Sequence, residues 1–250
     1  MDAYLWQVPV LVLVGTLAGF LNVLAGGGSL MTLPLLIFMG LPAATANGTN
    51  RIAIFCQNIF AITGFKRQGV FPIRLAALCT LPALIGSYIG ANLAISVDDQ
   101  TFRRLLALIM IGVLVFITLD PAKRLQQHEV HMSPWRVALL IVSFFLIGIY
   151  GGFVQAGVGF LIITALLVHG LDLVNINAVK VLVIFAFTIV ALGVFILHGQ
   201  VDYSLGLALA VGNSLGGWIG THVAVKRGHN WIKRFVSVTV LVFALKLLFF

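Results

Sequence analysis

The stretch that decides the fold runs from Ala25 to Arg51 and reads AGGGSLMTLPLLIFMGLPAATANGTNR. Three glycines precede an apolar run at 30–39, and a polar cluster that ends in Arg51 follows it. Ten apolar residues are about half of what a helix needs to cross a bilayer. Exposed backbone and polar groups are costly in hydrocarbon unless protein or water covers them. We therefore interpret this stretch as the first half of a transport site.

The composition predicts an all-α polytopic membrane protein. The chain has 250 residues, of which 61% are hydrophobic and 9% charged, and its mean hydropathy is +1.13. Soluble domains carry roughly 25% charged residues. The start, Met1-Asp2, has no basic region, so we expect no cleavable signal peptide. Cys56 and Cys79 lie inside apolar segments, which favours packing over a disulfide or a metal site.

Ten apolar segments are expected, and two of them are too short to span a bilayer. The ten are 5–24, 30–39, 44–65, 71–95, 102–119, 135–155, 160–169, 173–197, 203–225 and 232–250. The short segments, 30–39 and 160–169, hold the second place in each half. This order predicts a first membrane repeat at 1–119, a cytoplasmic connection at 120–134 and a second repeat at 135–250.

An internal repeat at a constant offset of 130 residues supports that division. Its informative matches are Gly27 with Gly157, Gly40-Leu41 with Gly170-Leu171, Asn47 with Asn177, Gly69 with Gly199, Gly86 with Gly216, Gly90 with Gly220 and Arg104 with Arg234. Each half then has about five segments, with a short or re-entrant segment in second place. Because five is odd, the two halves should have opposite orientations in the membrane.

Loop charges predict that both termini lie on the outer side of the membrane, opposite the cytoplasm. Lys66 and Arg67 follow the third segment, whereas the matching loop at 198–202 has no Lys or Arg. The loop after the fourth segment is acidic in half one and basic in half two, and the connection adds Lys123 and Arg124. Cytoplasmic loops collect Lys and Arg. The net charge of +8 therefore reports orientation, and we expect no nucleic-acid partner. Only the pair 103–104 departs from this pattern, and a role at a helix start would explain it.

The glycines beside the short segments are candidates for helix breaks. Gly26, Gly27 and Gly28 precede the first short segment, and Gly157 and Gly159 flank Val158 at the second. Broken helices expose N–H groups and a positive dipole, which favour anions. The alternative is that these glycines only let helices pack closely.

A polar cluster follows each short segment and offers a cation inside the membrane. Asn47, Asn50 and Arg51 share one face of a helix, at spacings of three and four residues, and Asn177 and Lys180 are also three apart. A buried Arg or Lys costs about 2.5–3.5 kcal/mol on insertion scales, so such residues usually work in a cavity. Arg can bind two oxygens of one anion, and Lys supplies a point charge. The alternative is that both side chains snorkel to the headgroups.

The complete predicted substrate-binding set is Gly26, Gly27, Gly28, Ser29, Asn47, Thr49, Asn50, Arg51, Gln155, Gly157, Asn177 and Lys180. Other polar residues in apolar stretches, Asn22, Gln57 and Asn58, either line the path or bond other helices. His169 and Asp172 either relay protons or form a pair in a loop.

Two blocks of motifs carry a resemblance to a known family. The first comprises Gly19-Phe20, 25–29, Pro34-Leu35-Leu36, Gly40-Leu41-Pro42, 46–51 and Gly69, and the second comprises Gly157, Gly159, Gly170-Leu171, Asn177, Lys180, Gly199 and 216–220. Together they resemble the TauE/SafE sulfite-exporter family over nearly the whole chain. The resemblance implies a bacterial inner-membrane transporter of anions such as sulfite, sulfonates or related organic acids. Half two departs from half one at Val158 and Thr164, so the halves need not contribute equally.

The resulting hypothesis is a secondary transporter that binds a small anion between the two repeats and works by alternating access. The alternatives are a passive anion channel, a membrane subunit without transport activity, and an intramembrane enzyme. The last would need Ser29 as nucleophile, but no His is placed to act as its base. We expect no cofactor or metal. The expected partners are the anion and membrane lipid. Coupling to protons or to the membrane potential is left open, as is the oligomeric state, for which a homodimer is one option.

Overall fold

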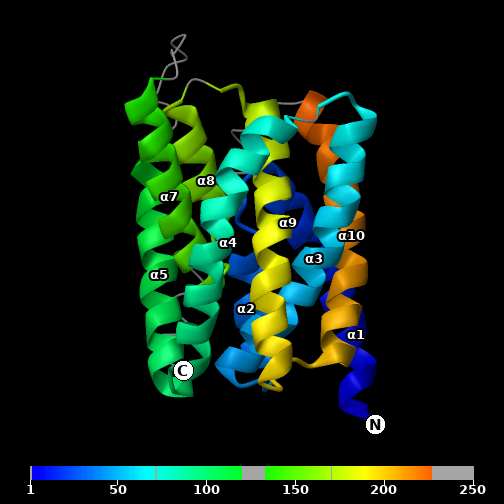
Figure 1. Ribbon diagram of the computed structural model, residues 1–250. Helices are drawn as coiled ribbons and strands as arrows, with labels where there is room; N and C mark the ends of the chain where they lie inside the picture. Colours follow the sequence, from blue (N-terminus) through cyan, green and yellow to red (C-terminus); the bar gives the residue numbers. More distant parts are fainter. Residues whose placement is uncertain (1, 71, 120–132, 170, 227–250) are drawn as a thin grey trace.

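The computed structural model describes residues 2–70, 72–119, 133–169 and 171–226. Within these ranges the chain is helical and shows no strand. The helices are α1 Asp2–Leu24, α2 Ser29–Phe38, α3 Ala43–Arg67, α4 Ile73–Ser96, α5 Asp99–Leu119, α7 Pro134–Phe153, α8 Val158–Leu167, α9 Leu173–Leu197 and α10 Tyr203–Lys226 (Figure 1). The predicted segment 232–250, the match of Arg104 with Arg234, Gly170, Arg227 and the charges of the connection at Lys123 and Arg124 lie outside the described residues.

The helix bounds repeat at the offset of 130 residues. Helices α3 and α9 differ by 130 at both ends, α4 and α10 differ by 130 at their starts, and α2 and α8 have ten residues each. The ends of α3 and α9 are built alike, because Gly69 and Gly199 both have positive φ, at 77° and 66°. After each of these glycines, the next N–H returns to a carbonyl of the last helical turn, which is the Schellman ending that favours glycine.

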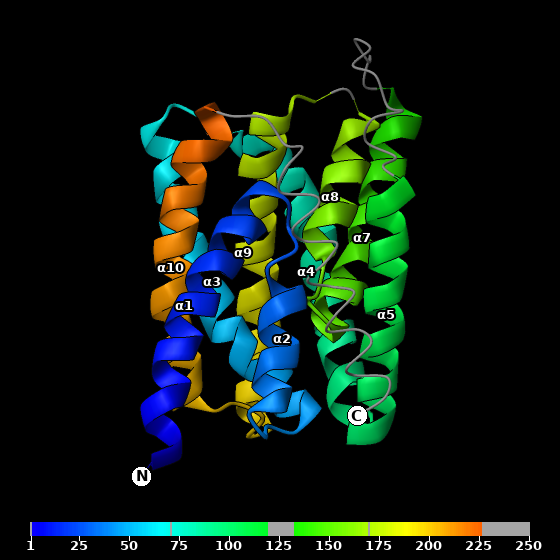
Figure 2. The ribbon, with the colours of Figure 1, turned by 180° about the vertical axis from the view of Figure 1, so that it is seen from behind.

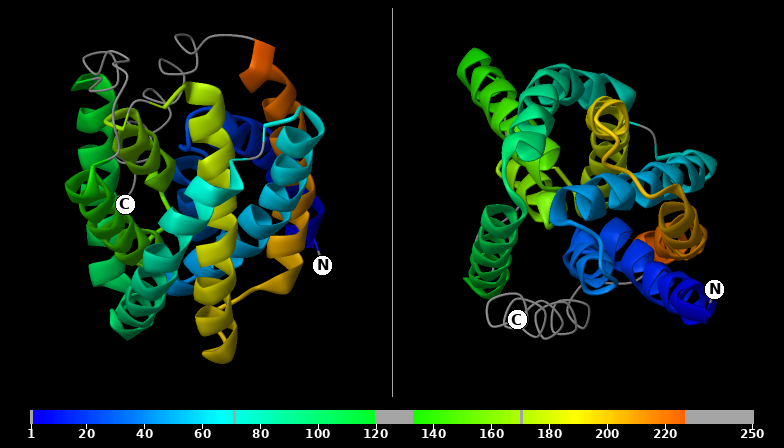
Figure 3. Two further views of the ribbon diagram at one scale, coloured as in Figure 1. Left: turned by 45° about the horizontal axis from the view of Figure 1, so that its top comes forward. Right: turned by 90° about the horizontal axis from the view of Figure 1, so that it is seen from below.

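The first helix of each half packs against the fourth helix of the other half. The packing order runs α1, α10, α3, α9, α4, α7, so α3 and α9 lie at the centre (Figures 2 and 3). Glycines make this packing close. A Cβ on Gly90 of α4 would lie 2.0 Å from the carbonyl oxygen of Ile149 on α7, and one on Gly216 of α10 would lie 1.9 Å from that of Thr16 on α1.

Matched helices run in opposite directions. In Figure 1, α3 rises from the bottom to the top, whereas α9 descends from the top to the bottom. Likewise α4 descends and α10 rises. The two short helices are surrounded by apolar side chains, and Leu30, Leu33 and Leu36 of α2 and Ile162 and Leu166 of α8 have no exposed surface.

Four of the described helices are long and apolar enough to cross a membrane, judged by length and composition alone: Trp6–Leu24, Ile73–Ser96, Pro134–Phe153 and Leu173–Leu197. Helices α3, α5 and α10 are of similar length, with 25, 21 and 24 residues, but carry more polar side chains. Many large apolar side chains face outward, among them Leu81 and Leu146. Such a surface suits hydrocarbon better than water.

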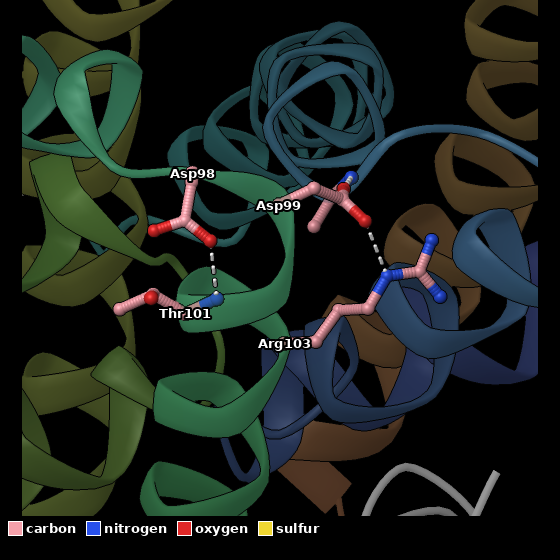
Figure 4. Close-up of polar contacts among 5 residues, drawn as sticks. Asp98, Asp99, Thr101 and Arg103 are labelled. Carbon is pink, nitrogen blue, oxygen red and sulfur yellow. Dashed lines mark hydrogen bonds and ion pairs between the residues drawn. The ribbon is translucent and has the colours of Figure 1, made fainter.

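Hydrogen bonds at the start of α5 explain why Arg103 departs from the pattern of loop charges (Figure 4). The carboxylate of Asp98 accepts the N–H of Thr101 at 2.9 Å, and Asp99 pairs with Arg103 at 2.7 Å. The hydrogen bonds from Thr101 hold the pKa of Asp98 below its ordinary value. Asp99 also accepts the N–H of Ala43 at the start of α3. Arg103 therefore has a partner at a helix start, as the sequence suggested.

Candidate functional site

The two breaks in the chain lie against each other. Gly26, just after α1, has a φ of +81°, and Gly157, just before α8, has a φ of +74°. A Cβ on Gly26 would lie 2.3 Å from the Cα of Gly159, and a Cβ on Gly159 would lie 2.2 Å from the Cα of Gly26. The backbones of the two halves are therefore in direct contact. The positive φ of half one is at Gly26, one residue before the position that the offset pairs with Gly157.

The two short helices, α2 and α8, both begin at this backbone contact. Helix α2 starts at Ser29, which is buried, and α8 starts at Val158. A Cβ on Gly28 would lie 2.1 Å from the carbonyl oxygen of Ala18, so that glycine also brings backbones together. The first N–H groups of a helix have no partner inside it and carry its positive dipole. Two such helix starts converge near the junction of the halves.

Arg51 of α3 reaches across to the end of α7. Its side chain has no exposed surface. One terminal nitrogen, Nη1, donates to the carbonyl of Gly151 at 3.1 Å and the other, Nη2, to that of Gly152 at 2.5 Å. The guanidinium also lies 4.9 Å from the centre of the Phe195 ring of α9. The last carbonyls of a helix lack partners and favour a cation, so Arg51 stabilises the end of α7.

Lys180 of α9 does the same for the end of α1. It has no exposed surface, and its Nζ donates to the carbonyl of Val23 at 2.7 Å and to Oδ1 of Asn177 at 2.6 Å. Each cation thus holds the last turn of the first helix of the opposite half. The alternative in which both side chains snorkel to headgroups does not hold in this structure. These carbonyl partners were not among the sequence-based expectations.

Several buried polar atoms of the predicted site residues have no partner in the part of the chain that the structure describes. They are Nε of Arg51, Nδ2 of Asn50, Oδ1 of Asn47 and Oε1 of Gln155. The other side-chain atoms of the two asparagines are used: Asn47 donates to the carbonyl of Phe153 at 2.7 Å, and Asn50 accepts from Thr32 at 2.6 Å. Of the unpaired atoms, the first two are donors and the last two are acceptors. A buried donor or acceptor without a partner costs about 1–3 kcal/mol, so these atoms suit a polar ligand or water.

Two predicted site residues bond elsewhere. The hydroxyl of Thr49 accepts the N–H of Asp202, in the loop before α10, at 2.8 Å. The amide of Gln155 donates to the hydroxyl of Thr188 on α9 at 2.7 Å. Thr32 and Thr188 were not predicted, because a single threonine inside an apolar run gives no sequence signal of its own.

A second buried polar cluster joins α1, α3 and α10. Oε1 of Gln57 accepts the amide of Asn22 at 3.1 Å and that of Asn213 at 3.4 Å. Of the two interpretations offered for Asn22 and Gln57, bonding between helices is the one that the structure shows.

His169 and Asp172 bond to different partners. The ring nitrogens of His169 lie 2.7 Å from the carbonyl of Ala165 and 3.3 Å from that of Arg136. Asp172 caps α9 by accepting the first-turn N–H groups of Val174 and Asn175. Partial burial, the largest single influence, raises the pKa of Asp172, but the hydrogen bonds from Asn175 and Val174 outweigh it and leave that pKa below its ordinary value.

Comparisons with known proteins also indicate a membrane transporter. The family model described as sulfite exporter TauE/SafE matches residues 11–247. A probable membrane transporter protein of Haemophilus influenzae is 25% identical over 100% of this chain and 97% of its own length. The probable membrane transporter protein YfcA of Escherichia coli K12 is 28% identical over 96% and 89%. YjnA of Bacillus subtilis, with the same description, is 27% identical over 94% and 96%. No solved structure matches this chain.

Proposed function

The chain belongs to the TauE/SafE sulfite exporter family, and from that premise we propose that it is a secondary transporter of small anions, such as sulfite, sulfonates or related organic acids. It would work by alternating access in the bacterial inner membrane. Its relatives are described as probable membrane transporters, which supports the broad class of activity.

The proposed architecture is a pair of inverted repeats with their breaks at the centre. The offset of 130 in the helix bounds and the opposite directions of matched helices support it. In this arrangement α3, α5 and α10 cross the membrane together with the four apolar helices. The division into repeats at 1–119 and 135–250, and the periplasmic position of both termini, belong to the same proposal.

The observation that carries the proposal is a pair of buried cations, one from each half, beside the junction of the breaks. Arg51 and Lys180 have no exposed surface. Removing a charge from water costs several kcal/mol even when carbonyls accept its hydrogen bonds, so a protein retains a buried cation where it has a task. Arg51 Nε and Asn50 Nδ2 supply two unpaired donors on the same helix, and the starts of α2 and α8 add dipoles of the right sign. Together they suit an oxyanion.

The carbonyl partners of the cations suggest how binding moves the halves. Both cations now donate to neutral carbonyls of the opposite half. An anion adds a charge–charge attraction that a neutral carbonyl cannot supply. An anion would therefore compete with the carbonyls for Arg51 and Lys180. Exchange of partners would loosen the ends of α7 and α1 and allow one half to move against the other.

The test is anion uptake into proteoliposomes by purified variants. Arg51→Gln and Lys180→Gln should each weaken transport by about 30-fold or more. Each variant loses the buried ion pair with the bound anion, and such a loss costs about 2–5 kcal/mol. Arg51→Lys should retain part of the activity, because it keeps the charge but loses the fork. Arg103→Gln, which removes only a surface ion pair, is the matched control and should transport normally.

A thermal-shift panel of sulfite, thiosulfate, sulfonates and carboxylates separates loss of binding from loss of folding. The wild-type chain and Arg103→Gln should be stabilised by the transported class, and the two glutamine variants should be folded yet unresponsive. Intact uptake by the double variant Arg51→Gln/Lys180→Gln would refute the site assignment. Flux that neither saturates nor accumulates the anion uphill would favour a passive channel.

A further inference from the structure

A groove of about 800 Å³ runs along the outer face of the protein between α3 and α10. It extends from Cys56 and Leu207 at one end to Arg67 and Trp218 at the other. Large exposed apolar side chains such as Phe60 line it. In Figure 1 the two helices stand side by side at one edge of the molecule. The groove lies away from the junction of the breaks and is not part of the transport site.

The length of the groove matches one leaflet of a bilayer. Cys56 to Arg67 on α3 and Leu207 to Trp218 on α10 each span eleven residue steps. At a rise of 1.5 Å per residue this is about 16 Å, or roughly half of a hydrocarbon core that is about 30 Å thick. An acyl chain that enters at the end with Arg67 would therefore lie in the groove over its whole depth.

The groove carries positive charge at one end only. Arg67 lies in the last turn of α3, is exposed, and holds its guanidinium 5.4 Å from the centre of the Trp218 ring. Lys66 adds a second cation to the same turn. Tryptophan is typical of the membrane interface, and arginine binds phosphate through two oxygens. The residue that matches Arg67 in half two is Leu197, which is 83% exposed, so the corresponding end of α9 offers no such cation.

We propose that this groove binds one anionic phospholipid, with an acyl chain between α3 and α10 and the phosphate on Arg67. The charge and the depth both favour a lipid over a second copy of the chain. A two-fold contact on this face would repeat the same residues on both sides and bring two Arg67 side chains to one level of the membrane. Like charges oppose such a contact, whereas an anionic headgroup satisfies Arg67.

Native mass spectrometry of the purified full chain in mild detergent tests this proposal. It counts bound lipids and copies of the chain in one measurement. Phosphatidylglycerol should give a first adduct at least fivefold tighter than phosphatidylcholine. Arg67→Gln should remove that preference. Arg74→Gln is the matched control, because it removes an exposed cation near the same end that does not line the groove, and it should bind both lipids as the wild type does.

A second variant tests the groove itself without altering charge. Val211→Trp places a bulky ring at a groove residue that is 55% exposed, so the fold should tolerate it. It should weaken the first adduct of both lipids. Equal affinity of wild-type chain for the two lipids, or of Arg67→Gln and Arg74→Gln for phosphatidylglycerol, would overturn the proposal. So would a dimer that Val211→Trp dissociates, since a second copy would then occupy the groove.

Discussion

Replacement of Gly159 by alanine should force the two halves apart at their junction. The added Cβ would lie 2.2 Å from the Cα of Gly26. Carbon atoms in contact normally lie about 3.5–4.0 Å apart, so the two backbones would have to separate by about 1 Å or more. Backbone atoms cannot rotate away as the end of a side chain can. We therefore expect a cost of about 3 kcal/mol, the upper end of the usual range for overpacking.

Gly193→Ala is the matched control. Gly193 also lies in a helix, α9, but a Cβ there would meet nothing within 4 Å. Alanine is the better helix former by about 0.5–1 kcal/mol, so this variant should be as stable as the wild type or slightly more so. The two substitutions are chemically identical, and only the approach of Gly26 distinguishes them.

Thermal unfolding of both variants in the same detergent measures the difference. At about 2–4 °C per kcal/mol for a chain of this size, Gly159→Ala should unfold roughly 6–12 °C below the wild type. Anion uptake should fall with it, because the junction would be displaced. If Gly159→Ala and Gly193→Ala unfold at the same temperature, the contact between the breaks is not as close as the geometry indicates.

Two further predictions concern stability. Gln57→Leu leaves the buried amides of Asn22 and Asn213 without their acceptor, so it should lower the free energy of unfolding by about 1–3 kcal/mol. The control, Asn92→Ala on α4, removes a hydrogen bond at the surface and should change stability little. Thermal unfolding measures both variants. Asp172→Ala removes the cap of α9 and should cost about 1 kcal/mol at neutral pH. Because the pKa of Asp172 is lowered in the folded chain, its contribution is present above about pH 4 and is lost as the pH falls through the folded pKa. Unfolding temperatures should therefore converge in acid for wild type and Asp172→Ala, while Asp172→Asn, which still caps, should lose little at neutral pH.

The sequence predicted the fold well where the signal was periodic. The short apolar runs at 30–39 and 160–169 correspond to α2 and α8, and the shared glycines gave the offset that relates α3 to α9. A helix end that requires positive φ selects glycine, and the two halves therefore both have glycine at this position, as Gly69 and Gly199. Such local requirements can be recognised from the sequence alone.

The partners of the cations were not predictable in the same way. The spacing of Asn47 and Arg51 does bring both side chains to the end of α7, which agrees with one shared helix face. The carbonyls that they bond depend on how α3 packs against α7, and these helices lie about 100 residues apart in the chain. The spacing of residues within α3 does not predict that packing. Gly26, Gly27 and Gly28 were predicted together as a break, but the gapless offset pairs Gly157 with Gly27, whereas the positive φ of half one is at Gly26, because such an offset cannot show a shift of one residue.

The crosswise pairing of the helices has a consequence for biosynthesis. Helix α1 ends at Leu24 and its main neighbour, α10, begins at Tyr203. At a synthesis rate of about 5–20 residues per second, α1 is complete for roughly 10–40 s before α10 exists. During that time its glycine-lined face, including Gly15 and Gly19, has only lipid or another protein beside it. Contacts of such long sequence separation also slow folding. The first half therefore cannot reach its final packing during its own translation, because the neighbours of α1 and α4 are made only with the second half.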